Sequence, residues 1–135
     1  MNICIIIPVY NEETLIKESI ETILKYINKL KNISIIVVDD GSVDSTKEVL
    51  KGFVNLKKNN DIILLSHKYN KGYGAALNTG INYALSQNYD YALFMDSDLT
   101  NHPKYISRFI EKMNKGYEYI KATRYGKGGS VSGVS

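Results

Sequence analysis

Half of the acidic residues of this 135-residue chain fall in short polar segments that directly follow apolar runs. They are Glu12, Glu13, Asp39, Asp40, Asp44, Asp96 and Asp98. Carboxylates that crowd in a partly dry cleft repel one another, so they require cations, hydrogen-bond donors or an oxygen-seeking metal ion. The segment Asp96-Ser97-Asp98 is the best candidate for a metal site, because its carboxylates leave coordination positions for phosphate and water. We therefore predict that Asp96 and Asp98 bind Mg²⁺ or Mn²⁺ as a cofactor.

Other residues in these segments have the chemistry to bind a nucleotide. Gly41 permits a tight turn that leaves Asp40 facing a ligand, where its carboxylate can accept a hydrogen bond from a nucleobase N–H or from ribose. Tyr10 offers an aromatic face for the base, and Arg124 can bind a diphosphate with both prongs of its guanidinium. The alternatives are structural: helix caps or turns for single aspartates, surface packing for Tyr10 and a salt bridge for Arg124. Asp44 in particular is predicted to be a helix cap.

Apolar runs alternate with helical repeats along the chain, and this alternation predicts the elements that position these residues. Strands are predicted from Asn2 to Pro8, Ser34 to Asp39, Asp61 to Ser66, Tyr91 to Met95 and Tyr119 to Thr123. Helices are predicted from Glu13, from Ser45 to about Leu56, from Gly74 to Gln87 and from Pro103. In the third helix, the residues predicted to face inward are Ala76, Leu77, Ile81, Ala84 and Leu85. Parallel strands joined by right-handed crossovers would bring every strand-to-helix loop to one edge of the sheet, so we predict an α/β fold.

Composition and missing motifs exclude several classes of protein. The length predicts one domain, and a net charge of +3 is too small for a nucleic-acid-binding stripe. No apolar run approaches the roughly 18 residues that span a bilayer, and no signal peptide is visible, so we expect a cytoplasmic protein. Cys4 is expected to be a small buried hydrophobe, and His67 and His102 lack metal-ligand spacing. The segment from Lys71 to Ala76 lacks the third glycine of a dinucleotide fingerprint, which disfavours a Rossmann dehydrogenase.

Four motifs, taken in order, resemble family 2 glycosyltransferases of the GT-A fold, a Rossmann-like architecture. They are Pro8-Val9-Tyr10-Asn11-Glu12-Glu13, Val37-Val38-Asp39-Asp40-Gly41-Ser42, Lys71-Gly72-Tyr73-Gly74-Ala75-Ala76 and Asp96-Ser97-Asp98. Within that family the chain is most similar to dolichol-phosphate mannosyltransferases and related polyprenyl-phosphate glycosyltransferases. This closer similarity lies in Asp98-Leu99-Thr100, His102-Pro103-Lys104 and Thr123-Arg124-Tyr125.

The resemblance implies a nucleotide-sugar site. The residues that it assigns to the nucleoside are Pro8, Tyr10, Glu12, Val38 and Asp40. It implies that Asp96-Ser97-Asp98 binds the sugar donor's diphosphate, with the metal ion on Asp96 and Asp98. Asp98 and Arg124 are the catalytic candidates, because Arg124 would neutralise the leaving nucleoside diphosphate. Thr100 stands where some relatives have a metal-binding Gln, so a water molecule would take that position.

The implied reaction transfers a hexose from GDP-mannose or UDP-glucose to a polyprenyl or dolichyl phosphate, with the protein at the cytoplasmic face of the membrane. Such an acceptor is already anionic and needs no general base. Family sequences continue after the glycine-rich segment, whereas this chain stops at Ser135. We therefore expect a C-terminally truncated domain in which residues 1–135 form the nucleotide-sugar-binding part and the acceptor side is missing.

Three alternatives remain open at this point. The first is transfer to a glycan hydroxyl, which would require a general base. The second is a catalytically incomplete module that binds a nucleotide sugar without turnover. The third is a phosphatase, because Asp96-Ser97-Asp98-Leu99-Thr100 resembles the DxDxT motif of haloacid-dehalogenase-type enzymes, with Asp96 as the nucleophile. Neither the base of the sugar donor nor the oligomeric state follows from the sequence.

Overall fold

The computed structural model describes residues 2–54 and 61–98. In this part of the chain, strands and helices alternate strictly. They are β1 (Ile3–Val9), α1 (Ile16–Ile27), β2 (Ile33–Asp39), α2 (Thr46–Val54), β3 (Ile62–Ser66), α3 (Tyr73–Ser86) and β4 (Tyr91–Phe94). The strands pair in parallel in the order β3-β2-β1-β4, which confirms the predicted α/β class. The helix predicted from Pro103 and the strand predicted to begin at Tyr119 lie outside the described residues.

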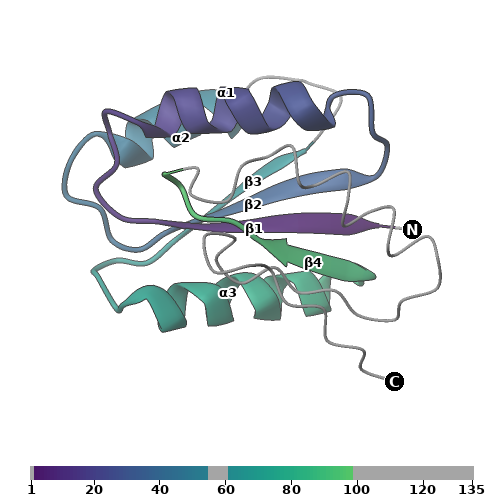
Figure 1. The fold of residues 1–135 in the computed structure, drawn as a ribbon. Coiled ribbons are helices and arrows are strands. Elements are labelled where there is room, and N and C mark those ends of the chain that lie inside the picture. The colour runs from purple at the N-terminus through teal and green to yellow at the C-terminus, as the bar shows by residue number, and fades with distance from the viewer. Residues whose placement is uncertain (1, 55–60, 99–135) are drawn as a thin grey trace.

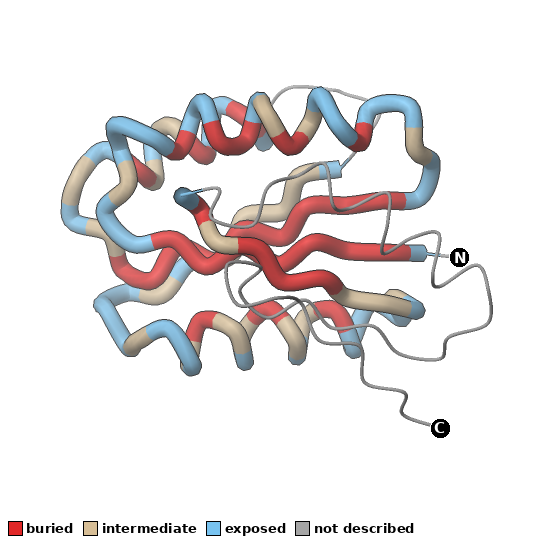
Figure 2. Tube along the Cα trace, viewed as in Figure 1, coloured by how far each residue is buried: buried red, intermediate tan, exposed pale blue. Residues whose placement is uncertain are grey.

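The sheet separates two layers of helix, with α1 and α2 on one face and α3 on the other (Figure 1). Successive side chains of a strand point to opposite faces, so Ile5 and Ile7 pack in the cluster that contains α1, and Cys4 and Ile6 pack against α3. Every residue of β1 and β2 is buried (Figure 2), as expected for the central strands of a parallel sheet. Cys4 is 0% exposed, which confirms that it is buried in the core, and this burial raises the pKa of its thiol to about 12.

Two sequence predictions about the helices are corrected by the structure. Helix α1 begins at Ile16 and not at Glu13, because the carbonyl of Glu12 accepts the N–H groups of Leu15 and Ile16 at 3.0 and 2.8 Å and closes a separate turn. Leu85 was predicted to face inward but is 70% exposed. The fully buried residues of α3 are the small residues Ala76, Gly80 and Ala84, and Leu77 and Ile81 are partly buried against the same core cluster, as predicted.

The strand order defines the edge at which a ligand can bind. The chain runs outward from β1 through β2 to β3, and then returns over the other face through α3 to β4. In open parallel sheets, ligands bind at the carboxyl ends of the strands where the order reverses, here between β1 and β4. The loops after the strands lie at this edge, on the left of Figure 1.

No helix in the described ranges has the length and apolar character needed to cross a membrane.

Candidate functional site

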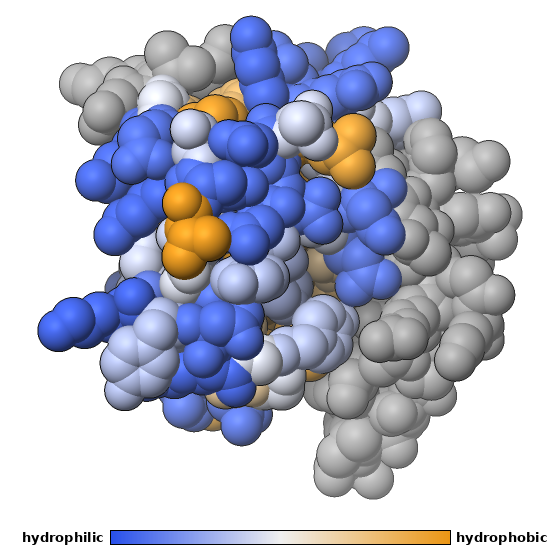
Figure 3. All heavy atoms as spheres, turned by 90° about the vertical axis from the view of Figure 1, so that its left-hand side faces the viewer, coloured by the Kyte–Doolittle hydropathy of each residue, from blue (hydrophilic) through white to orange (hydrophobic). Residues whose placement is uncertain are grey.

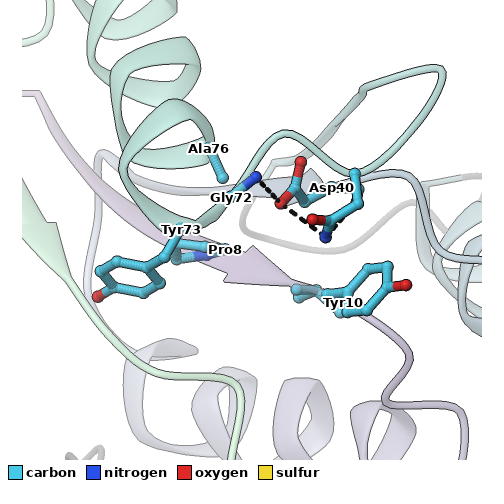
Figure 4. Close-up of a pocket in the computed structure, with 8 residues that line it drawn as sticks. Pro8, Tyr10, Asp40, Gly72, Tyr73 and Ala76 are labelled. Atoms are coloured by element: carbon cyan, nitrogen blue, oxygen red, sulfur yellow. Dashed lines mark hydrogen bonds between the residues drawn. The ribbon is translucent and has the colours of Figure 1, made fainter.

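A pocket of about 340 Å³ opens at the carboxyl ends of β1 and β2, beside the first turn of α3 (Figure 4). Its lining residues are Pro8, Val9, Tyr10, Asp40, Asn70, Gly72, Tyr73 and Ala76. Tyr10 and Tyr73 lie on either side of Pro8, and Asp40 lies next to Gly72 (Figure 4). Pro8, Tyr10 and Asp40 are residues that the sequence assigned to a nucleoside pocket. The structure therefore brings three predicted residues together around one cavity.

The buried carboxylate of Asp40 accepts four hydrogen bonds from the loop that follows β3. Its Oδ1 accepts from His67 Nδ1 at 2.7 Å and from the N–H of Lys71 at 2.9 Å. Its Oδ2 accepts from the N–H of Gly72 at 2.9 Å and from Asn70 Nδ2 at 3.1 Å. Burial raises the pKa of Asp40, but these hydrogen bonds and the nearby His67 outweigh it and hold the pKa below its usual value.

This network gives Asp40 a role that the sequence did not predict. Two carboxylate oxygens offer about four lone-pair sites, so the loop already occupies most of the accepting capacity of Asp40. The strand register explains the contact with His67, since Asp39 pairs with Ser66 and the next residue of each strand then lies side by side. Asp40 thus holds in place the loop that supplies Asn70 and Gly72 to the pocket.

His67 connects this loop to helix α3. Its Nε2 lies 2.7 Å from the hydroxyl oxygen of Thr79, and the O–H of Thr79 donates to the carbonyl of Ala75 at 3.0 Å. The side chain of His67 therefore bridges Asp40 and α3. His102 lies outside the described residues.

Gly41 is required by the close approach of two loops. Its φ is +74°, and a Cβ at this position would lie 2.2 Å from the carbonyl carbon of Tyr69 and 2.4 Å from the nitrogen of Asn70. These atoms belong to the backbone and cannot move aside like the end of a side chain. Gly41 has the positive φ that was the reason for expecting a glycine turn here, and its missing side chain lets the loop after β3 pack directly on the loop after β2.

Hydrogen bonds also join the loop after β1 to the part of the loop after β2 that follows Gly41. The N–H of Asn11 donates to Ser42 Oγ at 2.9 Å, and the side-chain oxygen of Asn11 accepts the N–H of Val43 at 2.9 Å. The N–H of Glu12 donates to the hydroxyl of Thr46, also at 2.9 Å. These bonds give the segment after β1 a structural role in addition to the ligand role predicted for it.

Two further acidic residues of this region cap helix α2. Asp44 accepts the N–H of Thr46 at 2.9 Å, which confirms the predicted cap, and Glu13 accepts the N–H of Ser45 at 3.0 Å. Desolvation raises the pKa of Asp44, but hydrogen bonds from Thr46 and from the N–H of Glu13 outweigh it and lower the pKa overall. Asp39 accepts the N–H of Ser42 at 3.2 Å. Backbone N–H groups thus donate hydrogen bonds to the carboxylates of Glu13, Asp39, Asp40 and Asp44, and these bonds offset the repulsion between the negative charges.

The turn after β4 carries the predicted metal ligands. Asp96 is partly buried and accepts the hydroxyl of Tyr73 at 3.3 Å, whereas Asp98 is exposed. The buried Ser97 between them accepts a hydrogen bond at its carbonyl from the hydroxyl of Ser19 at 2.6 Å. Tyr73 therefore lines the pocket and also contacts Asp96.

The residues of this turn fit a hard divalent ion. Among residues 2–54 and 61–98, no three His, Cys, Asp or Glu side chains gather in a group that could hold a metal ion alone. A typical Mg²⁺ site nevertheless needs only one or two carboxylates from the protein, because substrate phosphates and water complete the coordination. The carboxylates of Asp96 and Asp98 supply oxygen ligands of the required kind.

Several predicted site residues lie elsewhere. Val38 was predicted to line the pocket, but it is fully buried and packs with Ile6 and Ala76 in the core beneath it. Glu12 is not among the lining residues either. Arg124 and Thr100 lie outside the described residues. Asn70, Gly72 and Tyr73 were missed as pocket residues, although the glycine-rich motif after a predicted strand was a signal for the last two.

The face that contains the carboxyl ends of the strands is mainly hydrophilic, with separate small hydrophobic spots (Figure 3). One exposed apolar residue of this edge is Val43, which is 85% exposed. Tyr69 is also exposed, and Lys71 Nζ lies 5.6 Å from the centre of its ring. This lysine is thus placed over an aromatic face.

The chain matches a known protein family. Residues 4–133 match the family model for Glycosyl transferase family 2. Over 123 residues, the chain is 31% identical to the undecaprenyl-phosphate 4-deoxy-4-formamido-L-arabinose transferase of Proteus mirabilis (strain HI4320). That match covers 90% of this chain but 36% of the Proteus protein, so the chain spans about a third of its length.

Two solved structures with the same arrangement contain manganese. A mannosyltransferase from Pyrobaculum calidifontis in complex with GDP-Man and Mn²⁺ matches with a TM-score of 0.62 and 25% identity, over 72% of this chain and 27% of that one. Glucosyl-3-phosphoglycerate synthase from Mycobacterium tuberculosis, in complex with Mn²⁺, UDP-glucose and phosphoglyceric acid, matches with a TM-score of 0.63 and 25% identity. The second match covers 85% of this chain and 40% of the other.

Proposed function

Because this chain belongs to glycosyl transferase family 2 and has the GT-A fold, we propose that it binds a nucleotide-sugar donor in the pocket beside Tyr10 and Tyr73. The observation that carries the proposal is the position of Tyr73, which lines the pocket and donates a hydrogen bond to Asp96. A nucleoside in the pocket would therefore have its diphosphate directed toward the acidic turn after β4.

The base of the nucleotide packs against Tyr10 and Pro8 in this proposal. Tyr10 is 44% exposed, so one face of its ring is accessible to a base. Asp40 acts mainly through the loop that it holds, because its carboxylate already accepts four hydrogen bonds. The polar groups available to the nucleoside then include the side-chain oxygen of Asn70, whose amide nitrogen is engaged with Asp40.

Asp96 and Asp98 hold Mg²⁺ or Mn²⁺ in this proposal. The bound ion supplies charge stabilisation for the departing nucleoside diphosphate. Asp98 and Arg124 remain our catalytic candidates, with Arg124 beside the sugar donor's phosphates as a second positive charge. The Mn²⁺ in the two related solved structures supports a metal ion at the corresponding step.

We further propose that the reaction transfers a hexose from GDP-mannose or UDP-glucose to a polyprenyl phosphate at the cytoplasmic face of a membrane. The name of the Proteus relative supports a polyprenyl-phosphate acceptor. A phosphatase is disfavoured by the family and by the position of the DxD segment after the fourth strand rather than the first.

Residues 1–135 form the nucleotide-sugar-binding part of the domain in this proposal. The matched segment of the Proteus relative is 36% of its length, so the transfer step of the whole protein requires its own test. Incubating the chain with labelled GDP-mannose or UDP-glucose and a polyprenyl phosphate separates two possibilities. Formation of a labelled lipid indicates a complete transferase, whereas binding without labelled lipid indicates a module that binds the sugar donor alone.

Isothermal titration calorimetry tests the binding proposal. The chain is titrated with GDP-mannose, UDP-glucose and UDP-N-acetylglucosamine, each with and without Mn²⁺. We expect one of these sugar donors to bind, to bind more tightly with Mn²⁺, and to lose this metal dependence in Asp98→Asn. Asp90→Asn, at the opposite end of β4, is the matched control and should leave binding unchanged. Binding that is indifferent to both Mn²⁺ and Asp98→Asn would contradict the proposed site.

A further inference from the structure

Ser19 is a buried polar residue of helix α1 with an unusual partner. Its hydroxyl donates to the carbonyl of Ser97 at 2.6 Å, across 78 positions of the chain. Ser19 is 3% exposed and Ser97 is 8% exposed, so water cannot readily replace this bond. The bond links a helix on one face of the sheet to the acidic turn after β4.

The direction of this bond is not the usual one for a hydroxyl in a helix. Serine and threonine within helices commonly donate to the carbonyl four residues earlier, as Thr22 does to Glu18 at 2.8 Å in the same helix. The carbonyl four residues before Ser19 belongs to Leu15 and accepts the backbone N–H of Ser19, as in any helix, whereas the hydroxyl of Ser19 donates to the carbonyl of Ser97.

Holding the carbonyl of Ser97 determines the orientation of the peptide group between Ser97 and Asp98. This peptide plane sets the direction in which the backbone continues into Asp98. On the other side of Ser97, Tyr73 contacts Asp96 from α3, through a longer bond of 3.3 Å at an exposed position. The turn is therefore held from both helical layers, and the shorter, buried bond comes from Ser19.

We propose that Ser19 is a positioning residue that fixes the turn so that Asp96 and Asp98 can hold one divalent ion together. This inference rests on the proposed function of the acidic turn. Ser19 does not touch the metal or the substrate; it acts through the backbone of Ser97. Groups that orient metal ligands in this way affect the affinity for the metal although they do not bind it.

The test compares Ser19→Ala with Thr22→Ala in the full 135-residue chain. Binding of Mn²⁺ is followed by the loss of the free-ion electron paramagnetic resonance signal, in the presence of UDP and, separately, of GDP. We expect Ser19→Ala to weaken Mn²⁺ binding roughly tenfold, as for other outer-shell partners of metal ligands. Thr22→Ala should bind Mn²⁺ like the unmodified chain. Nucleotide binding without metal should be the same in all three proteins.

The outcomes separate this inference from the proposed function. If the unmodified chain binds no Mn²⁺ with either nucleotide, the proposed function itself fails. If it binds Mn²⁺ and Ser19→Ala binds equally tightly, the positioning role is wrong. An equal loss of metal-free nucleotide binding would also overturn it, because that result would indicate general damage to the fold. Should Ser19→Ala not fold, Ser19→Cys, with a similar volume and a weaker hydrogen-bond donor, provides the same comparison.

Discussion

At the scale of single residues, the most informative side chain is Asp40. An aspartate after a strand predicts a ligand contact or a turn, and here hydrogen bonds from the protein itself occupy most of the accepting capacity of the carboxylate. Four hydrogen bonds converge on it from the loop that lines one side of the pocket. The carboxylate is therefore a structural centre of the site, and changing it should alter stability and ligand binding together.

Stability should depend on pH through Asp40. Its pKa is lowered in the folded state, so its contribution is complete above the unfolded value of about 3.9 and is lost as the pH falls through the folded pKa. Asp40→Asn leaves buried N–H groups without acceptors, and we expect it to lower the free energy of unfolding by about 1–3 kcal/mol at pH 7. Urea denaturation of both proteins from pH 7 to pH 3 measures the difference. It should narrow below about pH 4, and a difference independent of pH would contradict this account.

Tyr10 should contribute to nucleotide affinity through its ring. Stacking of a base on an aromatic side chain is worth about 1–3 kcal/mol, so Tyr10→Ala should weaken binding of the nucleotide sugar about tenfold or more. Tyr10→Phe retains the ring and should bind like the unmodified chain. Tyr69→Ala is the control, because Tyr69 is 64% exposed and does not line the pocket. If all three variants bind alike in calorimetry, the base does not lie on Tyr10.

At the scale of elements, the close packing of the loops after β2 and β3 depends on Gly41. Gly41→Ala would place a Cβ 2.2 Å from the carbonyl carbon of Tyr69 at a φ of +74°, so we expect a loss of more than about 2 kcal/mol of stability. Gly52→Ala in α2 is the matched control. Nothing lies within 4 Å of its added Cβ, and the helix should gain about 0.5–1 kcal/mol. Urea denaturation distinguishes them, and equal effects would contradict the packing argument.

The elements themselves were largely predictable from the sequence, because their signals are local. Short apolar runs predicted the four described strands, and helical spacing predicted α1, α2 and α3. The prediction that Leu85 faces inward was wrong, because the packing of α3 on the sheet determines which of its residues are buried. Gly80 approaches β1 so closely that an added Cβ would lie 2.5 Å from Ile6 Cγ2, and this close contact favours a narrow stripe of small residues that leaves Leu85 exposed.

At the scale of the whole molecule, the topology made the general position of the site predictable. Parallel strands bring Tyr10, Asp40 and Asp96 to one edge, and the alternation of side chains explains why Pro8 and Asp40 share the face covered by α3. The hydrogen bonds between loops could not be predicted, since they join residues such as Asn11 and Val43 that are 32 positions apart. Val38 was misplaced for a related reason, because its depth in the core depends on how α3 packs.

We propose above all that the pocket binds the nucleoside of a nucleotide sugar and that the acidic turn binds its diphosphate through a metal ion. The most direct measurement is a crystal structure with Mn²⁺ and GDP-mannose or UDP-glucose, with data collected at the manganese absorption edge. Our account predicts one anomalous peak about 2 Å from carboxylate oxygens of both Asp96 and Asp98, with the diphosphate on the ion and the base against Tyr10. A manganese peak away from both aspartates, or a nucleotide bound outside the pocket, would contradict it.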